Sequence, residues 1–396
     1  MEEVEFLVVG AGPAGSTAAR EAARAGRATL VLEKDAVVGE KRVCAAGLRP
    51  GFCAEFNLPE ELVHCDTPRL ALFDTDAREH EVFFGPGHTS TREELDGTIA
   101  RLAQAEGAEI RTRSLFRSFE HDRNGVVVEY ADLAGGARKL IRARSVFLAQ
   151  GATAKLETTA LADTSWPAGI MTTLQHRIYL DRSAKAIAYQ TLELHYYPAR
   201  DGRILVAWMF PKRDHLAIGL GLIGKLDGRT LRAELEAFSS RVLRRLAPEA
   251  SIVGLKEEGH LLYGGRPRER TADGAVMLGG TAAGLVDATN GEGIFEAAMS
   301  GRIAAESVSS GARPENAAAR YAQRLRSRFK RRLEHRVRLM RFLEQRPARY
   351  GVLFEQLASS RRFSDALQRE DRERGPIDKL ILYANALQFG LRASFV

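Results

Sequence analysis

Three glycines near the N-terminus have the spacing of a site that binds the phosphates of a dinucleotide. Gly10, Gly12 and Gly15 form a G-x-G-x-x-G pattern directly after an apolar run at residues 6–9. In this motif the first glycine permits a tight turn, the second lets backbone N–H groups approach a pyrophosphate, and the third lets the helix pack on the strand. The phosphates then lie at the positively polarised N-terminus of that helix.

An acidic residue completes the predicted dinucleotide site. Glu33 follows a second apolar run at residues 28–32, about twenty residues past the glycines, where a carboxylate can accept hydrogen bonds from an adenosine ribose. Because a carboxylate disfavours a 2′-phosphate there, it indicates FAD or NAD rather than NADP. The order of strand, glycine turn, helix, strand and acidic residue predicts a βαβ unit of Rossmann type. A βαβ unit that binds nothing is the alternative.

The elements that must position these residues fall into four segments of the chain. Residues 1–155 and 260–312 have the strands, glycine-rich loops and helices of a nucleotide-binding domain. Alternating, aromatic-rich strands predict an antiparallel sheet inserted at residues 156–259, with strands near 186–197, 202–211 and 215–224. Residues 313–396 are expected to form a helical region.

Two local patterns sharpen this outline. A helix is expected from about Arg92 to Glu106. On the aromatic strands, side chains alternate between the two faces of a sheet. Trp208 and Phe210 are therefore expected on one face and Met209 on the other.

The composition is that of a soluble globular protein. The 396 residues are 45% hydrophobic and 28% charged, without a run of about eighteen apolar residues that could span a membrane. The N-terminus reads "MEEVEF" and has no signal-peptide pattern, so the expected location is the cytoplasm, either free or on the cytosolic face of a membrane. The three cysteines lack the spacing of a disulfide framework or a metal site.

The net charge of +7 comes from one segment. Residues 320–346 contain eleven Arg and Lys residues against two glutamates, which gives this segment a charge of +9. Its apolar residues recur at every fourth position and form one helical stripe: Tyr321, Leu325, Phe329, Leu333 and Val337. The stripe can pack on the protein itself, or the basic face can attract anionic lipid. We expect no nucleic acid, because no pattern of alternating aromatic and basic residues is present.

Three further motifs lie in the rest of the chain. They read "VCAAGL" at 43–48, "VAWMFPK" at 206–212 and "GGTAAGLVDATNGEGI" at 279–294. In this order, behind a single dinucleotide fingerprint, they resemble the geranylgeranyl reductase family of FAD-dependent oxidoreductases, which has the flavoprotein fold of the aromatic hydroxylases. The resemblance covers about residues 4–310. It implies an α/β fold, with a Rossmann-type FAD-binding domain, an inserted antiparallel β-sheet substrate domain and a C-terminal helical region.

The resemblance also implies an activity. Such enzymes saturate carbon–carbon double bonds of prenyl chains by hydride transfer from reduced FAD. The expected substrate is a geranylgeranyl-type chain, carried by a lipid, a chlorophyll, a quinone, a diphosphate or a secondary metabolite, and the expected electron donor is NADPH or ferredoxin. Two alternatives stay open: an FAD-dependent monooxygenase, hydroxylase or halogenase of an aromatic or secondary-metabolite substrate, and a family member without catalytic activity.

Site residues follow from the resemblance position by position. Cys44 and Trp208 are the expected catalytic residues, because the matching loop and strand of the family face the flavin. The residues expected to bind FAD are Gly10, Gly12, Pro13, Ala14, Gly15, Glu33, Lys34, Arg92, Gly280, Thr281, Gly284, Gly291, Gly293 and Ile294. No metal is expected. His195 and Tyr197 are candidate proton donors by chemical type alone.

The chain departs from the family pattern at three positions. Thr281 stands where the family has an aspartate that contacts the ribityl chain, Gln150 replaces the aspartate of an Ala-Asp-Gly motif, and Val206 replaces a tyrosine. A threonine hydroxyl can still hydrogen-bond a ribityl oxygen, and such a bond contributes about 1 kcal/mol net. We therefore expect FAD to remain the cofactor, whereas Gln150 cannot supply the charge of an aspartate.

Overall fold

The backbone forms two compact units that alternate along the chain. The computed structural model describes residues 1–396 except 41–43, 68, 83–86, 155, 158, 182–190, 200, 225, 370–373 and 395. Unit 1 comprises Met1–Arg42, Arg92–Ile170 and Leu261–Glu334, and unit 2 comprises Val43–Thr91, Met171–His260 and His335–Val396. The units cross the boundaries predicted for functional domains, and those boundaries stay predictions.

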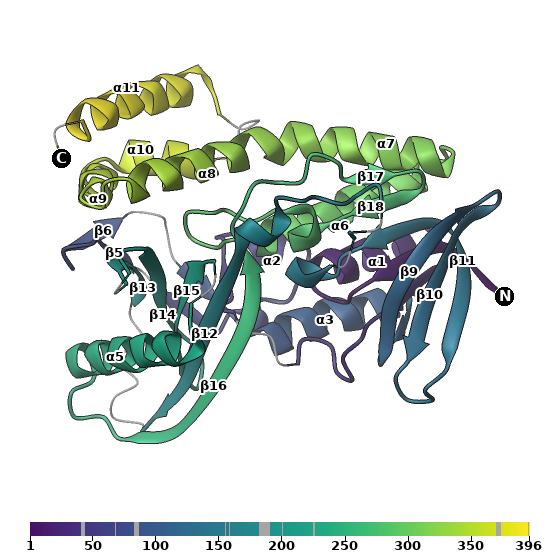
Figure 1. Ribbon diagram of the computed structural model, residues 1–396, viewed down its shortest axis with the longest axis horizontal. Coiled ribbons are helices and arrows are strands. Elements are labelled where there is room, and N and C mark those ends of the chain that lie inside the picture. The colour runs from purple at the N-terminus through teal and green to yellow at the C-terminus, as the bar shows by residue number, and fades with distance from the viewer. Residues whose placement is uncertain are drawn as a thin grey trace. The chain divides into compact units, whose positions relative to one another are not determined.

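The core of unit 1 is a sheet of eight strands (Figure 1). Five of them run parallel in the order β18, β11, β1, β2, β8, with bounds Val276–Leu278, Arg138–Leu148, Glu2–Val9, Thr29–Leu32 and Glu109–Arg111. Their last residues are in register: Val9 pairs with both Leu32 and Leu148, and Leu148 pairs with Leu278. The segments that follow these strands therefore leave the sheet at the same edge. The remaining strands, β9 (Ser114–Asp122), β10 (Gly125–Asp132) and β17 (Ala272–Asp273), pair antiparallel.

Helices α1 (Pro13–Arg24) and α6 (Ile294–Ser309) pack closely against one another in unit 1. The contact depends on Gly301, because a Cβ atom there would lie 2.1 Å from the carbonyl oxygen of Ala14 and 2.8 Å from the nitrogen of Ala18. Helix α3 (Arg92–Ala105) packs on α1 and confirms the helix predicted at this place. Unit 1 also contains α7 (Pro314–Leu325) and the short helices η2 (Gly151–Thr153), η3 (Trp166–Gly169) and η4 (Gly280–Ala283).

Unit 2 contains the predicted antiparallel sheet. Strands β12, β15, β14 and β13 pair in this order and are antiparallel throughout, with bounds Ile170–Leu180, Leu216–Ile223, Ile204–Pro211 and Thr191–Pro198. Residues 186–190 of the first predicted strand lie outside the described residues. The sheet also gains two strands from residues 43–91, which the sequence did not predict: β5 (Arg69–Phe73), parallel to β13, and β6 (Glu79–Val82). Strand β16 (Ile252–Tyr263) forms the opposite edge.

Smaller elements complete the part of unit 2 near the sheet. A three-stranded sheet consists of β3 (Gly47–Leu48), β7 (Gly87–Thr89) and β4 (Cys65–Thr67), and two short helices, α2 (Phe52–Glu55) and η1 (Glu60–Leu62), lie between β3 and β4 in the chain. Helix α5 (Gly228–Leu246) packs on one face of the large sheet, where Met209 is buried with Leu235 and Phe238. Phe210 belongs to a separate apolar cluster that includes Trp208, so the predicted alternation of these side chains is confirmed.

The basic segment forms a nearly continuous run of helix. It contains the end of α7, a turn of π-helix at Arg326–Lys330 and helix α8 (Arg331–Glu344). The five apolar residues of its stripe are at most 2% exposed: Tyr321, Leu325, Phe329, Leu333 and Val337. The stripe is therefore packed within the protein. Three helices follow, α9 (Arg349–Ser359), α10 (Arg361–Gln368) and α11 (Pro376–Arg392). Of the helices in the described chain, none has both the length and the apolar composition to cross a membrane.

The close contact of α1 with α6 leads to a stability prediction. A Gly301→Val substitution should lower the free energy of unfolding by about 3 kcal/mol, because the new side chain must separate the two helices. Gly390→Ala is the matched control. Gly390 lies in α11 with no atom within 4 Å of its Cβ position, so alanine should raise stability by about 0.5–1 kcal/mol. Urea unfolding followed by circular dichroism measures both, and equal midpoints for the two variants would contradict the assigned contact.

Candidate functional site

The candidate cofactor site lies where the parallel strands of unit 1 end. The glycine turn follows β1, Glu33 follows β2, Gln150 lies two residues after β11, and Gly280 lies two residues after β18. Ligands of open α/β sheets bind at the carboxyl ends of the strands. Residues that are up to 270 positions apart in the chain thus meet at one edge of the sheet.

The glycine turn brings backbone atoms closer together than side chains would permit. Gly10 has a φ of +98°, and a Cβ atom there would lie 2.6 Å from the carbonyl oxygen of Ala149. A Cβ atom at Gly15 would lie 1.8 Å from the carbonyl oxygen of Gly10. Gly12 precedes Pro13, the first residue of α1, and the nearest atom to its Cβ position is Nη2 of Arg92, at 3.7 Å. The turn therefore leaves room beside Gly12 at the N-terminus of a helix, where an anion is stabilised.

Glu33 is tied to the glycine turn by its own carboxylate. The side chain is 3% exposed, and its two oxygens accept hydrogen bonds from the N–H groups of Ala11 (2.7 Å) and Asp35 (3.0 Å). Each oxygen has a further lone pair with which it can accept a bond from a hydroxyl group. Lys34, by contrast, has a half-exposed side chain that pairs with Asp35 at 3.1 Å. Its ammonium group therefore lies at the surface, and Lys34 is left out of the FAD contacts proposed below.

Arg92 lies beside the N-terminus of α1. Its guanidinium donates two hydrogen bonds to Asp96, Nε to Oδ1 at 2.9 Å and Nη2 to Oδ2 at 2.6 Å. The Asp96 side chain is 1% exposed and that of Arg92 is 17% exposed, so Arg92 is not an ordinary surface residue. Asp96 was not identified from the sequence, although its spacing of four residues from Arg92 on a helix is a signal for such a pair.

The second glycine-rich segment packs on the first. A Cβ atom at Gly280 would lie 3.2 Å from Cβ of Ala14 in α1 and 3.3 Å from Cβ of Ala297 in α6. Thr281 is half-buried in η4, and Gly284 ends that helix in the left-handed conformation. Gly291 also has a positive φ, of 76°. Two residues on, Gly293 caps α6, whose first residue is Ile294. The first turns of α1 and α6 therefore meet at Gly280.

An unsatisfied acceptor tests whether a flavin cofactor fits these residues. The side-chain oxygen Oε1 of Gln150 is buried and has no hydrogen-bond partner among the residues that the structure describes. Its Cα atom lies 3.6 Å from the Cβ position of Gly10. Buried polar atoms in proteins are nearly always hydrogen-bonded. A ligand with hydroxyl or N–H donors would satisfy this oxygen, and FAD carries both, so the site fits FAD.

The loop that contains Cys44 lies on the large sheet of unit 2. The Cys44 sulfur accepts a hydrogen bond from Ala46 at 3.3 Å, and the ammonium group of the buried Lys212 donates to the carbonyl of Ala45. A Cβ atom at Gly47 would lie 2.6 Å from the ring of Phe210. This loop therefore lies against the same face of the sheet as Phe210. Val43, the first residue of the predicted motif, lies outside the described residues.

Trp208 lies on this face and is held by two residues that the sequence analysis missed. Its indole N–H donates to the side-chain oxygen of Gln175 at 3.0 Å. A Cβ atom at Gly219 would lie 2.3 Å from the ring, so only glycine lets the indole lie across β15. The alternating glycines of "GLGLIG" at 219–224 were a signal for such a contact. Ala45 packs in the cluster that contains Trp208, which brings the Cys44 loop and Trp208 together.

His195 and Tyr197 lie on the opposite face of the sheet, because side chains alternate along β13. His195 contacts Glu193 at 2.9 Å and stacks on Phe73 with ring centroids 4.0 Å apart. Burial lowers the pKa of His195 below its ordinary value. Tyr197 packs against Phe238 of α5. Neither residue can reach a molecule bound beside Trp208, so neither is retained as a proton donor.

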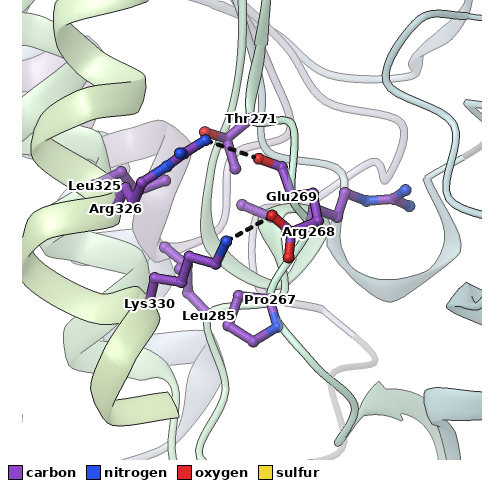
Figure 2. Close-up of a pocket in the computed structure, with 9 residues that line it drawn as sticks. Pro267, Arg268, Glu269, Thr271, Leu285, Leu325, Arg326 and Lys330 are labelled. Atoms are coloured by element: carbon purple, nitrogen blue, oxygen red, sulfur yellow. Dashed lines mark hydrogen bonds and ion pairs between the residues drawn. The ribbon is translucent and has the colours of Figure 1, made fainter. Parts of the chain in front are cut away.

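A small cavity elsewhere in unit 1 is not a substrate site. It is lined by Pro267, Glu269, Leu285 and Lys330, and Figure 2 shows Lys330 and Arg326 reaching Glu269 across it. Its volume of about 20 Å³ is enough for a single water molecule. The ion pair of Lys330 with Glu269 links the π-helical turn after α7 to the loop between β16 and β17.

Known proteins resemble this chain in sequence and in structure. Residues 8–42 match the family described as "NAD(P)-binding Rossmann-like domain". The digeranylgeranylglycerophospholipid reductase 1 of Methanopyrus kandleri is 30% identical over 339 residues, which cover 83% of this chain and 86% of that protein. The crystal structure of a geranylgeranyl bacteriochlorophyll reductase-like protein from Thermoplasma acidophilum matches with a TM-score of 0.76 at 21% identity, covering 98% of this chain and 96% of that one. A flavin-dependent brominase matches with a TM-score of 0.72 at 18% identity, covering 98% and 99%.

The two structural matches show the fold, and the sequence match shows the family. The α/β flavoprotein fold predicted from the motifs is confirmed. The glycine turn, Glu33 and the unsatisfied Gln150 fit FAD, and the chain is an enzyme rather than a family member without activity. This chain belongs to the geranylgeranyl reductase family of FAD-dependent oxidoreductases.

Proposed function

We propose that this enzyme saturates carbon–carbon double bonds of a prenyl chain of geranylgeranyl type. The observation that carries the proposal is the apolar face of unit 2 beside the Cys44 loop, formed by Leu70, Leu192, Leu194, Trp208, Phe210 and Ala217. An isolated alkene offers neither charge nor hydrogen bonds, so a protein can hold it only through shape and apolar contacts. The indole N–H of Trp208 already donates a hydrogen bond to Gln175. It therefore needs no hydrogen-bond acceptor from a molecule bound on this face.

The cofactor residues are proposed from the geometry of unit 1. When bound, FAD in its reduced form supplies the hydride for one alkene carbon, and a proton is added to the other. The turn at Gly10 and Gly12 and the first turn of α1 receive the diphosphate, and Glu33 accepts from the ribose. Arg92 adds positive charge beside Gly12. The remaining proposed contacts are Pro13, Ala14, Gly15, Gly280, Thr281, Gly284, Gly291, Gly293 and Ile294.

The electron donor and the membrane surface belong to the same proposal. The chain has one dinucleotide fingerprint, so NADPH or ferredoxin would reduce the enzyme from a transient binding position.

A prenyl chain carried by a lipid also favours peripheral association with an anionic membrane. The arginines of residues 320–346 would attract such a surface electrostatically, and salt would weaken this attraction.

The function is tested by the absorption spectrum of the flavin without oxygen. After anaerobic reduction, addition of geranylgeranyl diphosphate or of a geranylgeranylated phospholipid should restore the oxidised spectrum, because the alkene takes up the electrons. A mass gain of two hydrogens per double bond should accompany it. A spectrum that returns only with oxygen, together with a hydroxylated or halogenated product, would instead support the monooxygenase alternative.

Glu33 is expected to control the affinity for FAD. Glu33→Ala removes the acceptor for the N–H groups of Ala11 and Asp35 and for the ribose, so the Kd for FAD should rise at least about tenfold, which equals about 1.4 kcal/mol. Lys34→Ala, one residue away at the surface, should leave the Kd unchanged. Titration of the apoprotein with FAD, followed by flavin fluorescence, measures both. Equal Kd values for the two variants would remove Glu33 from the proposed site.

Cys44 is expected to affect turnover without affecting the cofactor. Cys44→Ala changes the loop on the Trp208 face and should lower kcat for prenyl reduction by about tenfold or more, with an unchanged flavin content. Cys53→Ala is the matched control, because Cys53 is buried in α2 and burial raises the pKa of its thiol, so it does not supply a thiolate. If both variants turn over at the wild-type rate, Cys44 has no part in the reaction.

A further inference from the structure

The C-terminal helix α11 has apolar residues on two opposite faces. One face packs in unit 2, where Phe389 is 9% exposed and belongs to an apolar cluster with Tyr350 and Phe354. Ile381 and Leu382 pack on the same cluster. This inner face also carries Asn385, whose backbone oxygen accepts a hydrogen bond from Gln356 at 2.9 Å. The inner face therefore fixes the helix on α9, and Figure 1 shows α11 beside α9 and α10.

The outer face of α11 carries large apolar side chains that remain in contact with water. The exposed fraction is 74% for Ile377, 67% for Leu380, 65% for Tyr383, 52% for Leu387 and 68% for Leu391. We call this set the α11 stripe. The intervals of three and four residues place all five side chains on one side of the helix. At 1.5 Å per residue the stripe is about 21 Å long.

A helix with apolar residues on both faces is expected to have a second apolar environment. Scattered apolar residues on a protein surface need no explanation, but a contiguous exposed row marks a site of interaction. The stripe is one helix wide and has five side chains, whereas a stable interface between two proteins uses about 20–30 residues on each side. These dimensions fit the interfacial layer of a bilayer, in which amphipathic helices lie parallel to the surface.

The charges of α11 agree with a lipid surface as the partner. Its only acidic residue is Asp378, which is 8% exposed and accepts hydrogen bonds from Arg369 (2.7 Å) and from the N–H of Gly375 (3.0 Å). Lys379 is exposed next to the stripe. Tyr383 is of a residue type enriched at membrane interfaces. The exposed side of α11 thus presents no carboxylate that phospholipid headgroups would repel.

We infer that the α11 stripe inserts into the interfacial layer of a phospholipid membrane and holds unit 2 there. The inference rests on the proposed function, since a prenyl chain carried by a lipid must be reached at the membrane. The cluster under α11 continues inward through Tyr350 and Phe354 to Tyr196 on the sheet face that also bears Leu194. An apolar path within unit 2 therefore joins the lipid-binding helix to the face proposed for the substrate.

Co-sedimentation of the FAD-loaded enzyme with vesicles tests the inference. Vesicles of phosphatidylcholine with phosphatidylglycerol are used at low salt and at about 1 M salt, where the Debye length is about 3 Å and charge attraction is largely screened. The wild type should bind at both salt concentrations. The double variant Leu380→Gln, Leu391→Gln should bind about tenfold more weakly than the wild type at high salt. Salt screens the electrostatic attraction to the vesicle but does not weaken the insertion of apolar side chains.

A matched control carries the same change elsewhere on unit 2. Val253 and Leu255 on β16 are 67% and 55% exposed, so Val253→Gln with Leu255→Gln should leave binding unchanged. All four positions are exposed, and equal unfolding midpoints would show that both double variants are folded. In a third variant, Tyr383→Trp should shift the tryptophan emission to shorter wavelength on addition of vesicles, a shift that the wild type lacks.

Three results would overturn the inference. The first is equal binding of the wild type and the Leu380 and Leu391 double variant. The second is complete loss of wild-type binding at high salt, which would assign the membrane contact to the arginines of residues 320–346 alone. The third is a dimer in analytical ultracentrifugation that the double variant loses, which would make a second copy the partner. None of these measurements involves turnover, so a failure of the membrane inference can be distinguished from a failure of the proposed prenyl reduction.

Discussion

The candidate cofactor site depends on the close approach of three backbone segments in unit 1. The turn after β1 passes within contact distance of the start of α1, since a Cβ atom at Gly15 would lie 1.8 Å from the Gly10 carbonyl. The start of α1 in turn touches α6 at Gly301 and η4 at Gly280. Side chains at these places would separate the elements by several ångströms. Because the segments are close, two helix N-termini, the Glu33 carboxylate and the unsatisfied Gln150 oxygen lie at one edge of the sheet.

Alternation along the strands separates two chemical environments in unit 2. On the α5 side of β13, the buried Glu193 contacts His195 and accepts a hydrogen bond from the exposed Arg245. On the other side, Leu192 and Leu194 lie with Trp208 and Phe210 in apolar surroundings. A buried charge is tolerated only where it is paired, so the sheet keeps its charged group away from the face proposed for the prenyl chain. The apolar face then suits an alkene.

Buried and exposed apolar stripes have different roles in the C-terminal helices. The stripe of the basic segment is covered by the protein itself, so its arginines can act on a membrane only by charge. The α11 stripe is exposed although its residues are equally apolar. In the sequence both segments have the apolar periodicity of a helix. Only the packing of α11 on α9 through Phe389 shows which face of α11 remains exposed to solvent.

The sequence alone determined the local elements and most of the candidate cofactor residues, because these depend on residue types at short spacing along the chain. The glycine pattern with Glu33, the helix at Arg92, the antiparallel strands and the alternation of Trp208, Met209 and Phe210 all follow from local periodicity and backbone sterics. Those expectations describe elements one by one. They do not say which elements touch.

The tertiary structure decided the contacts between distant segments. It joined β5 and β6 to the sheet of unit 2, placed Lys212 under the Cys44 loop and Gln175 on Trp208, and turned His195 and Tyr197 to the face away from that loop. It also buried one apolar stripe and exposed another. These outcomes depend on burial and on pairing between residues far apart in the chain, and each is settled by the packing of the whole unit, which no short stretch of sequence contains.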